Sequence, residues 1–173
     1  MDSVFKSLIQ NIPAIFYRCK SDNYWTVIFI NEAVHDLTGY PCSDYIQNKS
    51  RTFASIVHPE DINYLNDSIH NALKQQKHWN IEYRIITKKG AIRWASETGV
   101  GIFSATNELQ YLEGFILDIS DRKKNEEEIK HQSTRDALTD LSNRYAMTDF
   151  LVNEVSRSSR HNYFSAVLFL DLD

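Results

Sequence analysis

The chain has 173 residues, which is enough for one complete domain and the beginning of a second. Hydrophobic residues make up 42% of it and charged residues 24%, with only three prolines and five glycines. A chain of this composition buries a core, so collagen-like, mucin-like and wholly disordered proteins are excluded. The net charge of −4 leaves no general basic surface, and we expect no binding to nucleic acid.

The sequence indicates a cytoplasmic segment. Residues 1–10 mix charged with apolar side chains and lack the pattern of a signal peptide. The longest apolar run, residues 166–170, is far shorter than the roughly 18 to 20 residues that cross a bilayer. Cys19 and Cys42 form neither a zinc-binding nor a disulfide pattern, which fits a reducing compartment. We therefore expect no membrane contact in this segment.

The first part of the chain predicts two strands followed by helices. Residues 16–18 and 25–30 are aromatic and β-branched, and the turn-rich residues 21–23 separate them, so we expect a hairpin. Residues 31–49 show short, interrupted helical patterns. A longer helix is expected to begin at Pro59, because proline suits the first helical position and apolar residues at helical spacing follow it.

Three further strands are expected after this helix. Residues 79–85 alternate between apolar and polar side chains, which is the period of a strand with one buried face. A second strand covers residues 92–94. A third, residues 111–119, is apolar on both faces and is expected to be more deeply buried. Together with the preceding elements, these strands predict an α+β domain over residues 1–120.

The composition changes abruptly beyond this domain. Residues 121–136 contain five basic and five acidic residues and only one aliphatic residue, Ile129. This pattern predicts a solvated helical linker, which we assign to residues 121–135. An amphipathic helix capped by Asn143 and a short strand over residues 165–170 are expected to follow.

Six short motifs in the first 120 residues occur in an order typical of one family. They are Trp25, Ile30-Asn31, the stretch from Phe53 to His58-Pro59-Glu60-Asp61, Glu82-Tyr83-Arg84, Lys89-Gly90-x-x-Arg93-Trp94 and the stretch from Gly114 to Asp118-Ile119-Ser120-Asp121-Arg122-Lys123. With these motifs the segment resembles a PAS domain of the kind that carries a tryptophan in an early loop. The resemblance implies a five-stranded antiparallel sheet with helices on one face, enclosing a pocket used for sensing. Ser120 stands where the family usually has threonine, and it keeps the hydroxyl group.

Two blocks after the linker are similar to the beginning of a GGDEF domain. One runs from Asp136 through Leu138-Thr139-Asp140-Leu141 to Asn143-Arg144, with Asp140 where glycine is usual, and the other is Phe169-Leu170-Asp171-Leu172-Asp173. The resemblance implies a diguanylate cyclase, which condenses two GTP molecules into cyclic di-GMP. Residues 136–173 are then the truncated N-terminal part of this α/β domain.

The GGDEF resemblance also implies a metal site. Mg²⁺ prefers hard oxygen ligands and would bridge the triphosphate. By resemblance, the carboxylate of Asp171 and the backbone carbonyl of Leu172 would bind it. The family's signature loop and its other catalytic groups would follow residue 173, so we expect no enzymatic activity from this chain alone. GTP and Mg²⁺ would bind only in a longer parent protein.

The PAS resemblance implies a pocket, for which apolar residues on the expected inner faces are the candidates. They are Phe16, Ile28, Ile30, Phe53, Ile56, Ile62, Leu65, Ile69, Tyr83, Ile85 and Trp94. Tyr83 and Ser96 would supply its polar groups. Such walls suit a small organic ligand or no ligand at all, and the sequence does not identify the signal.

Known PAS cofactors are not indicated. A haem would need an inward histidine, but His70 lies about 110° from the apolar stripe of its helix and is expected to face solvent. A light-oxygen-voltage flavin sensor would need a cysteine within residues 46–53, which contain none, and Cys42 lies outside that segment. His131 lacks the neighbours of a phospho-acceptor histidine. We expect no cofactor in this chain.

The function that these observations favour is a PAS sensor of a bacterial signalling protein that controls a C-terminal diguanylate cyclase through a dimeric helical linker. The expected partners are a second copy of the chain and a small-molecule ligand. Two alternatives stay open: a haem- or flavin-binding redox or gas sensor, and a non-catalytic interaction module whose GGDEF domain is degenerate.

Overall fold

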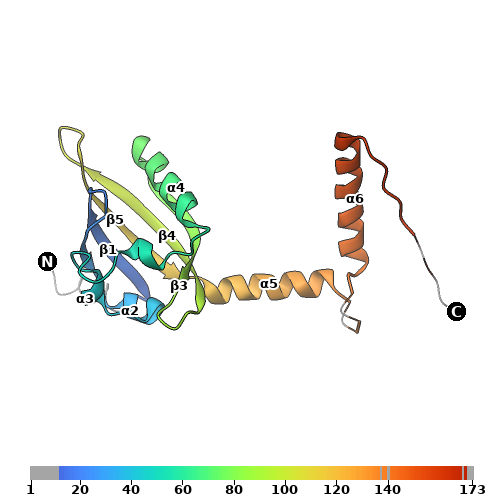
Figure 1. Ribbon diagram of the computed structural model, residues 1–173, viewed down its shortest axis with the longest axis horizontal. Coiled ribbons are helices and arrows are strands. Elements are labelled where there is room, and N and C mark those ends of the chain that lie inside the picture. Colours follow the sequence, from blue (N-terminus) through green and yellow to red (C-terminus); the bar gives the residue numbers. More distant parts are fainter. Residues whose placement is uncertain (1–11, 137, 140, 169, 171–173) are drawn as a thin grey trace. The chain divides into compact units, whose positions relative to one another are not determined.

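The computed structural model describes residues 12–136, 138–139, 141–168 and 170. The chain divides after Asp121 into two compact units, the first of which contains the sheet and its covering helices (Figure 1). Among the described residues, no helix is both long and apolar enough to cross a membrane.

The first unit is built on a five-stranded antiparallel sheet. Its strands are β1 (Ala14–Lys20), β2 (Val27–Ile30), β3 (Trp79–Ile86), β4 (Ile92–Phe103) and β5 (Leu109–Asp118), and their order across the sheet is β2-β1-β5-β4-β3. The expected hairpin of β1 and β2 is confirmed. β4 is much longer than the predicted residues 92–94, because its residues 92–99 pair with β3 and its residues 95–103 pair with β5.

Helices cover one face of this sheet (Figure 1). They are α2 (Ala33–Thr38), α3 (Cys42–Tyr45), the 3-10 helix η1 (Phe53–Ile56) and α4 (Ile62–Lys74). The prediction that the long helix begins at Pro59 is wrong: residues 58–61 form a turn, in which the Asp61 N–H donates to the His58 carbonyl, and α4 begins at Ile62.

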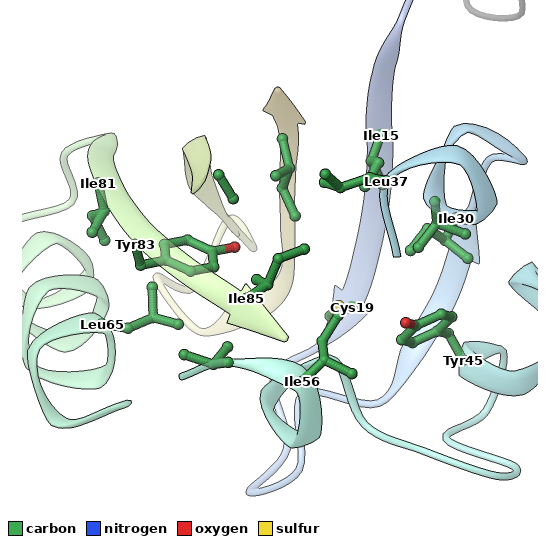
Figure 2. Packing of buried hydrophobic residues seen from close by; sticks show 14 of the residues in the cluster. Ile15, Cys19, Ile30, Leu37, Tyr45, Ile56, Leu65, Ile81, Tyr83 and Ile85 are labelled. Carbon is green, nitrogen blue, oxygen red and sulfur yellow. The ribbon is translucent and has the colours of Figure 1, made fainter. Parts of the chain in front are cut away.

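The core lies between the sheet and these helices. All four alternating apolar residues of β3 are buried, as predicted from the alternation: Trp79, Ile81, Tyr83 and Ile85. Figure 2 shows Tyr83 and Ile85 from β3 among the core residues, with Leu65 of α4 and Ile56 of η1 nearby. The expectation that β5 is buried on both faces is wrong. Only Leu112 and Ile116 are buried, because helices cover a single face.

Two glycines in the middle of the sheet make room for aromatic rings. Tyr17, Gly114, Gly99 and Trp79 are paired in one row across β1, β5, β4 and β3. A Cβ atom on Gly99 would overlap the Trp79 indole, and one on Gly114 would lie 2.7 Å from the Tyr17 hydroxyl. Both rings therefore lie over glycine backbone, where any other residue would displace them.

Replacing Gly99 with alanine is expected to lower the free energy of unfolding by about 1–3 kcal/mol, because the new methyl group overpacks against the Trp79 ring. Urea denaturation measures the change. In a Trp79→Leu background the same substitution should cost less than half as much, since the ring that it meets is gone. An equal cost in the two backgrounds would contradict this account of Gly99.

The second unit contains most of α5 (Ser120–Thr134) and all of α6 (Arg144–His161). Asn143 caps α6, as predicted, by accepting a hydrogen bond from the Ala146 N–H at 3.0 Å. The expected strand over residues 165–170 does not form in its described part, and the expected buried face of α6 has no buried residue. A single strand without a neighbour has no ladder of hydrogen bonds to hold it.

Candidate functional site

A cavity of about 90 Å³ lies on the inner side of the sheet. Residues from β1, β2, β4, β5, η1, α4 and the loop between β1 and β2 line it: Tyr17, Cys19, Tyr24, Trp25, Val27, Ile30, Phe53, Ala54, Leu65, Asn66, Ile69, Glu97, Leu112 and Ile116. A cavity of about 150 Å³ holds benzene, so this cavity has room for a smaller molecule.

Four residues predicted from the sequence line this cavity: Ile30, Phe53, Leu65 and Ile69. Four others belong to the core without lining the cavity. Ile56, Tyr83 and Ile85 are buried in it, and the partly buried Ile62 packs against it.

The prediction is wrong for Phe16, Ile28 and Trp94, which do not lie on the inner face. Phe16 and Ile28 line a groove on the opposite face of the sheet. Trp94 alternates along β4 with the buried Ala95 and contacts Arg84, whose guanidinium lies 5.9 Å from the indole centroid. Ser96 is likewise out of phase with the buried residues of β4. An error of one position along a strand moves a side chain to the other face.

The charged side chain in the cavity wall is Glu97, which was not among the residues predicted from the sequence. It lies on the inner face of β4 and is 5% exposed. Its Oε1 accepts hydrogen bonds from the Tyr17 hydroxyl at 2.6 Å and the Trp79 Nε1–H at 3.0 Å. Its Oε2 accepts one from the Tyr83 hydroxyl at 2.7 Å. Three donors from β1 and β3 thus stabilise one buried carboxylate.

Burial determines the proton state of the groups around Glu97. Desolvation, followed by the nearby Glu97 charge, raises the pKa of Tyr17 and of Tyr83 well above its ordinary value. Both phenols therefore stay protonated and act as donors. Desolvation also raises the pKa of the Cys19 thiol to about 12, so Cys19 is a neutral wall of the cavity and not a thiolate nucleophile.

The loop between β1 and β2 supplies one side of the cavity. Asp22 Oδ1 accepts hydrogen bonds from the backbone N–H groups of Tyr24, at 3.1 Å, and Thr26, at 2.9 Å. Between them, Trp25 has a φ of 46°, a conformation uncommon for a large side chain. Its ring lies 5.9 Å from the ring of His70, which is exposed as predicted. This turn holds Trp25 in the cavity wall.

A second set of hydrogen bonds fixes the chain where the sheet ends and α5 begins. Asp118 accepts from Arg93 Nη1 at 3.0 Å and from the Ser120 N–H at 2.9 Å. The Ser120 hydroxyl oxygen in turn accepts from the Trp94 N–H at 3.0 Å. The first residue of α5 is therefore attached to β4, the strand that carries Glu97.

An ion pair also joins the beginning of α4 to β3. Asp61 accepts hydrogen bonds from the Arg84 backbone N–H at 2.8 Å and from its Nε at 2.9 Å and Nη2 at 2.6 Å. These bonds and the guanidinium charge lower the pKa of Asp61. The carboxylate thus stabilises the turn that precedes α4.

Asp61→Asn is expected to reduce the free energy of unfolding by about 1–3 kcal/mol at pH 7. Because the pKa of Asp61 is lowered on folding, its contribution is present above the ordinary carboxyl pKa of about 4 and is lost as the pH falls below it. Denaturation from pH 7 to pH 3 should therefore show the two proteins converging. Asp67→Asn, on the exposed side of α4, is the control and should change little. A constant difference across this pH range would contradict the role of the ion pair.

The proposed metal ligands Asp171 and Leu172 lie outside the described residues, as does Asp140. Within the described part of the chain, no group of three or more histidine, cysteine, aspartate or glutamate residues could hold a metal ion.

Solved structures of sensory proteins have the same fold. One is a sensory box histidine kinase/response regulator from Burkholderia thailandensis, with a TM-score of 0.60 and 19% identity, over 73% of this chain and 92% of that one. Another is the N-terminal domain of a diguanylate cyclase with PAS/PAC sensor from Marinobacter aquaeolei, with a TM-score of 0.57 and 20% identity, over 64% of this chain and 98% of that one. At these identities the likeness concerns the fold.

A sequence relative is the methyl sulfide methyltransferase-associated sensor of Methanosarcina acetivorans, which is 26% identical over 133 residues. The match covers 76% of this chain but spans only 13% of the length of that relative. The family model described as the PAS fold matches residues 27–116, which is more than half of the chain. These residues include every element that lines the cavity except β1 and the loop that follows it. The chain therefore belongs to the PAS family as a sensory module of signalling proteins.

Proposed function

We propose that this PAS domain controls a diguanylate cyclase whose domain begins at residue 136 of the chain, with residues 121–135 as the signalling linker between dimeric partners. The observation that carries the proposal is the sequence block from Asp136 to Arg144, which is similar to the opening of a GGDEF domain. The Marinobacter structure of the same fold comes from a diguanylate cyclase with a PAS/PAC sensor, which supports the pairing of the two domains.

The contacts within this block give its polar residues structural roles. Asp136 Oδ1 accepts hydrogen bonds from the Thr139 N–H at 3.0 Å and the Thr139 hydroxyl at 2.9 Å. The Asp136 N–H donates to the Leu141 carbonyl at 2.8 Å. Asn143 then caps α6. The aspartate, threonine and asparagine of the motif are thus needed to turn the chain from α5 into α6.

The hydrogen bonds at the end of β5 support a route for the signal. A change in the cavity acts first on the inner face of β4, which carries Glu97. The beginning of β4 holds Asp118 and Ser120 through Arg93 and Trp94, so a shift of β4 reaches the first turn of α5. The linker would then change the orientation of the domains that it carries.

Product analysis with GTP and Mg²⁺ tests this proposal. A parent protein that continues through the complete GGDEF domain should make cyclic di-GMP, and residues 1–173 alone should make none. Cyclic di-GMP from residues 1–173, or none from the parent protein, would contradict the assignment. The second outcome would favour an interaction module with a degenerate GGDEF domain.

We also propose that the cavity holds neither haem nor flavin. Ligand pockets for drug-sized molecules measure about 300–1,000 Å³, several times the 90 Å³ of this cavity. His70 is exposed, and its Nδ1 lies 2.7 Å from the Asn66 carbonyl oxygen. The purified protein is therefore expected to lack absorption at about 400–450 nm, where haem and flavin absorb. A stoichiometric band there would favour the redox or gas sensor.

A further inference from the structure

Glu97 is a buried carboxylate without a cationic partner. All three of its hydrogen-bond donors, from Tyr17, Trp79 and Tyr83, are neutral. Among the residues that the structure describes, no lysine, arginine or histidine forms an ion pair with it. A carboxylate that is 95% shielded from water is costly unless a positive charge lies nearby. The fold therefore keeps a negative charge in its interior that its own side chains do not neutralise.

This charge lies at the wall of the cavity, where a ligand can reach it. Of the described residues that line the cavity, Glu97 alone is charged, and none is a lysine, arginine or histidine. Oε2 of the carboxylate accepts a single hydrogen bond, from Tyr83, and can interact with one further group. An anionic ligand would meet the Glu97 charge with no compensating group, so the cavity excludes anions.

The rest of the lining suits an alkylated cation. Four aromatic side chains contribute to it: Tyr17, Tyr24, Trp25 and Phe53. Aromatic rings attract cations, and they do so most strongly when water is excluded. The aliphatic residues around them favour methyl groups over a hydrated metal ion or a bare ammonium ion. The cavity of about 90 Å³ is smaller than a cavity of about 150 Å³ that holds benzene, which limits the ligand to fewer heavy atoms than benzene has.

We propose that this cavity binds a small alkylated ammonium ion, whose charge is balanced by Glu97 and whose methyl groups contact the aromatic wall. The inference deepens the proposed sensory function, because it names the chemical class of the signal. It also gives a reason for the glutamate on the inner face of this sheet: the empty cavity carries an unbalanced charge, and the cation removes this cost when it binds.

Calorimetric titration of the 173-residue protein with tetramethylammonium chloride tests the proposal. Tert-butanol is the neutral comparison, because it has the same number of heavy atoms and a similar shape, and sodium chloride keeps the ionic strength constant. Wild-type protein should bind tetramethylammonium at least about tenfold more tightly than tert-butanol. Equal affinities for the two compounds, or no binding of the cation, would overturn the proposal.

Two variants locate the binding. Glu97→Gln keeps the shape of the side chain, and the Tyr83 hydroxyl can turn to accept from the new amide, so this variant should fold but bind the cation at least about tenfold more weakly. Glu113→Gln is the matched control on the outer face, where Glu113 pairs with the exposed Arg18, and should bind within twofold of wild type. An unchanged affinity in Glu97→Gln would overturn the proposal.

If Glu97→Gln does not fold, Trp25→Leu decides the question, since it removes an aromatic wall of the cavity and leaves Glu97 in place. It should weaken tetramethylammonium binding more than it weakens tert-butanol binding, because only the cation loses an attraction to the ring, and an unchanged affinity for the cation would count against the proposal. These measurements do not involve the cyclase. Cation binding without any effect on cyclic di-GMP synthesis in the parent protein would contradict the proposed function and leave the ligand assignment standing.

Discussion

Replacing Glu97 with alanine is expected to lower the free energy of unfolding by about 3 kcal/mol or more. The substitution removes the acceptor of three hydrogen bonds at once, and it leaves the hydroxyls of Tyr17 and Tyr83 and the indole N–H of Trp79 without a partner. Each buried donor that loses its acceptor costs about 1–3 kcal/mol. Water that enters the neighbouring cavity would hydrate some of these three donors. We therefore expect the lower end of their summed cost.

Chemical denaturation of Glu97→Ala, Glu97→Gln and Glu113→Ala measures this effect. Glu97→Gln should lose much less than Glu97→Ala, because it keeps an acceptor oxygen for Tyr17 and Trp79. Glu113→Ala removes only a pair with the half-exposed Arg18 and should change stability by at most about 1 kcal/mol. If Glu97→Ala were no less stable than Glu113→Ala, the hydrogen-bond cluster around Glu97 would have no structural role.

The sequence predicted those parts of the fold in which hydrophobic alternation and burial agree. On β3, the alternation of Trp79, Ile81, Tyr83 and Ile85 identified the buried face correctly. Hydrophobicity failed on β1, because its outer face also carries a large apolar residue: Phe16 packs against Phe115 there, with ring centroids 6.2 Å apart. Hydrophobicity alone cannot tell which face the helices will cover.

Glu97 was missed because the strand that carries it has weak strand propensity. Residues 95–101 include Ala95, Ser96, Gly99 and Gly101, which are depleted in strands, and the predicted strand therefore stopped at residue 94. Pairing with β3 and β5 on both sides overrides this local preference. The predicted phase of the strand was also wrong: with Trp94 and Ser96 on the inner face, extending the strand would have placed Glu97 on the outer face, whereas Ala95, Glu97 and Gly99 are the buried residues. The two glycines have tertiary causes that no local pattern contains: a Cβ atom on Gly99 would overlap the Trp79 ring, and one on Gly101 would crowd Leu73 and Leu109.

The linker is expected to transmit the signal through its rotational phase, and insertions into α5 of the parent protein test this. Salt bridges stabilise the helix along its surface, such as Arg122–Glu126 at 2.8 Å and Lys124–Glu128 at 3.7 Å. Its one aliphatic residue after the first turn, Ile129, is 67% exposed. A pair of such helices has a weak apolar seam, so its register can shift when the PAS domain changes.

Duplicating residues 122–128 adds seven residues and rotates whatever follows by about 700°, which is nearly two complete turns. Duplicating residues 127–128 adds two and rotates it by about 200°. Because cyclic di-GMP synthesis needs two GTP-bearing domains to face each other, the seven-residue insertion should keep regulated activity within about twofold. The two-residue insertion should change activity by at least about fivefold, the lower end of ordinary coupling between sites. Equal effects of the two insertions, with both proteins still dimeric by light scattering, would mean that α5 is a passive tether.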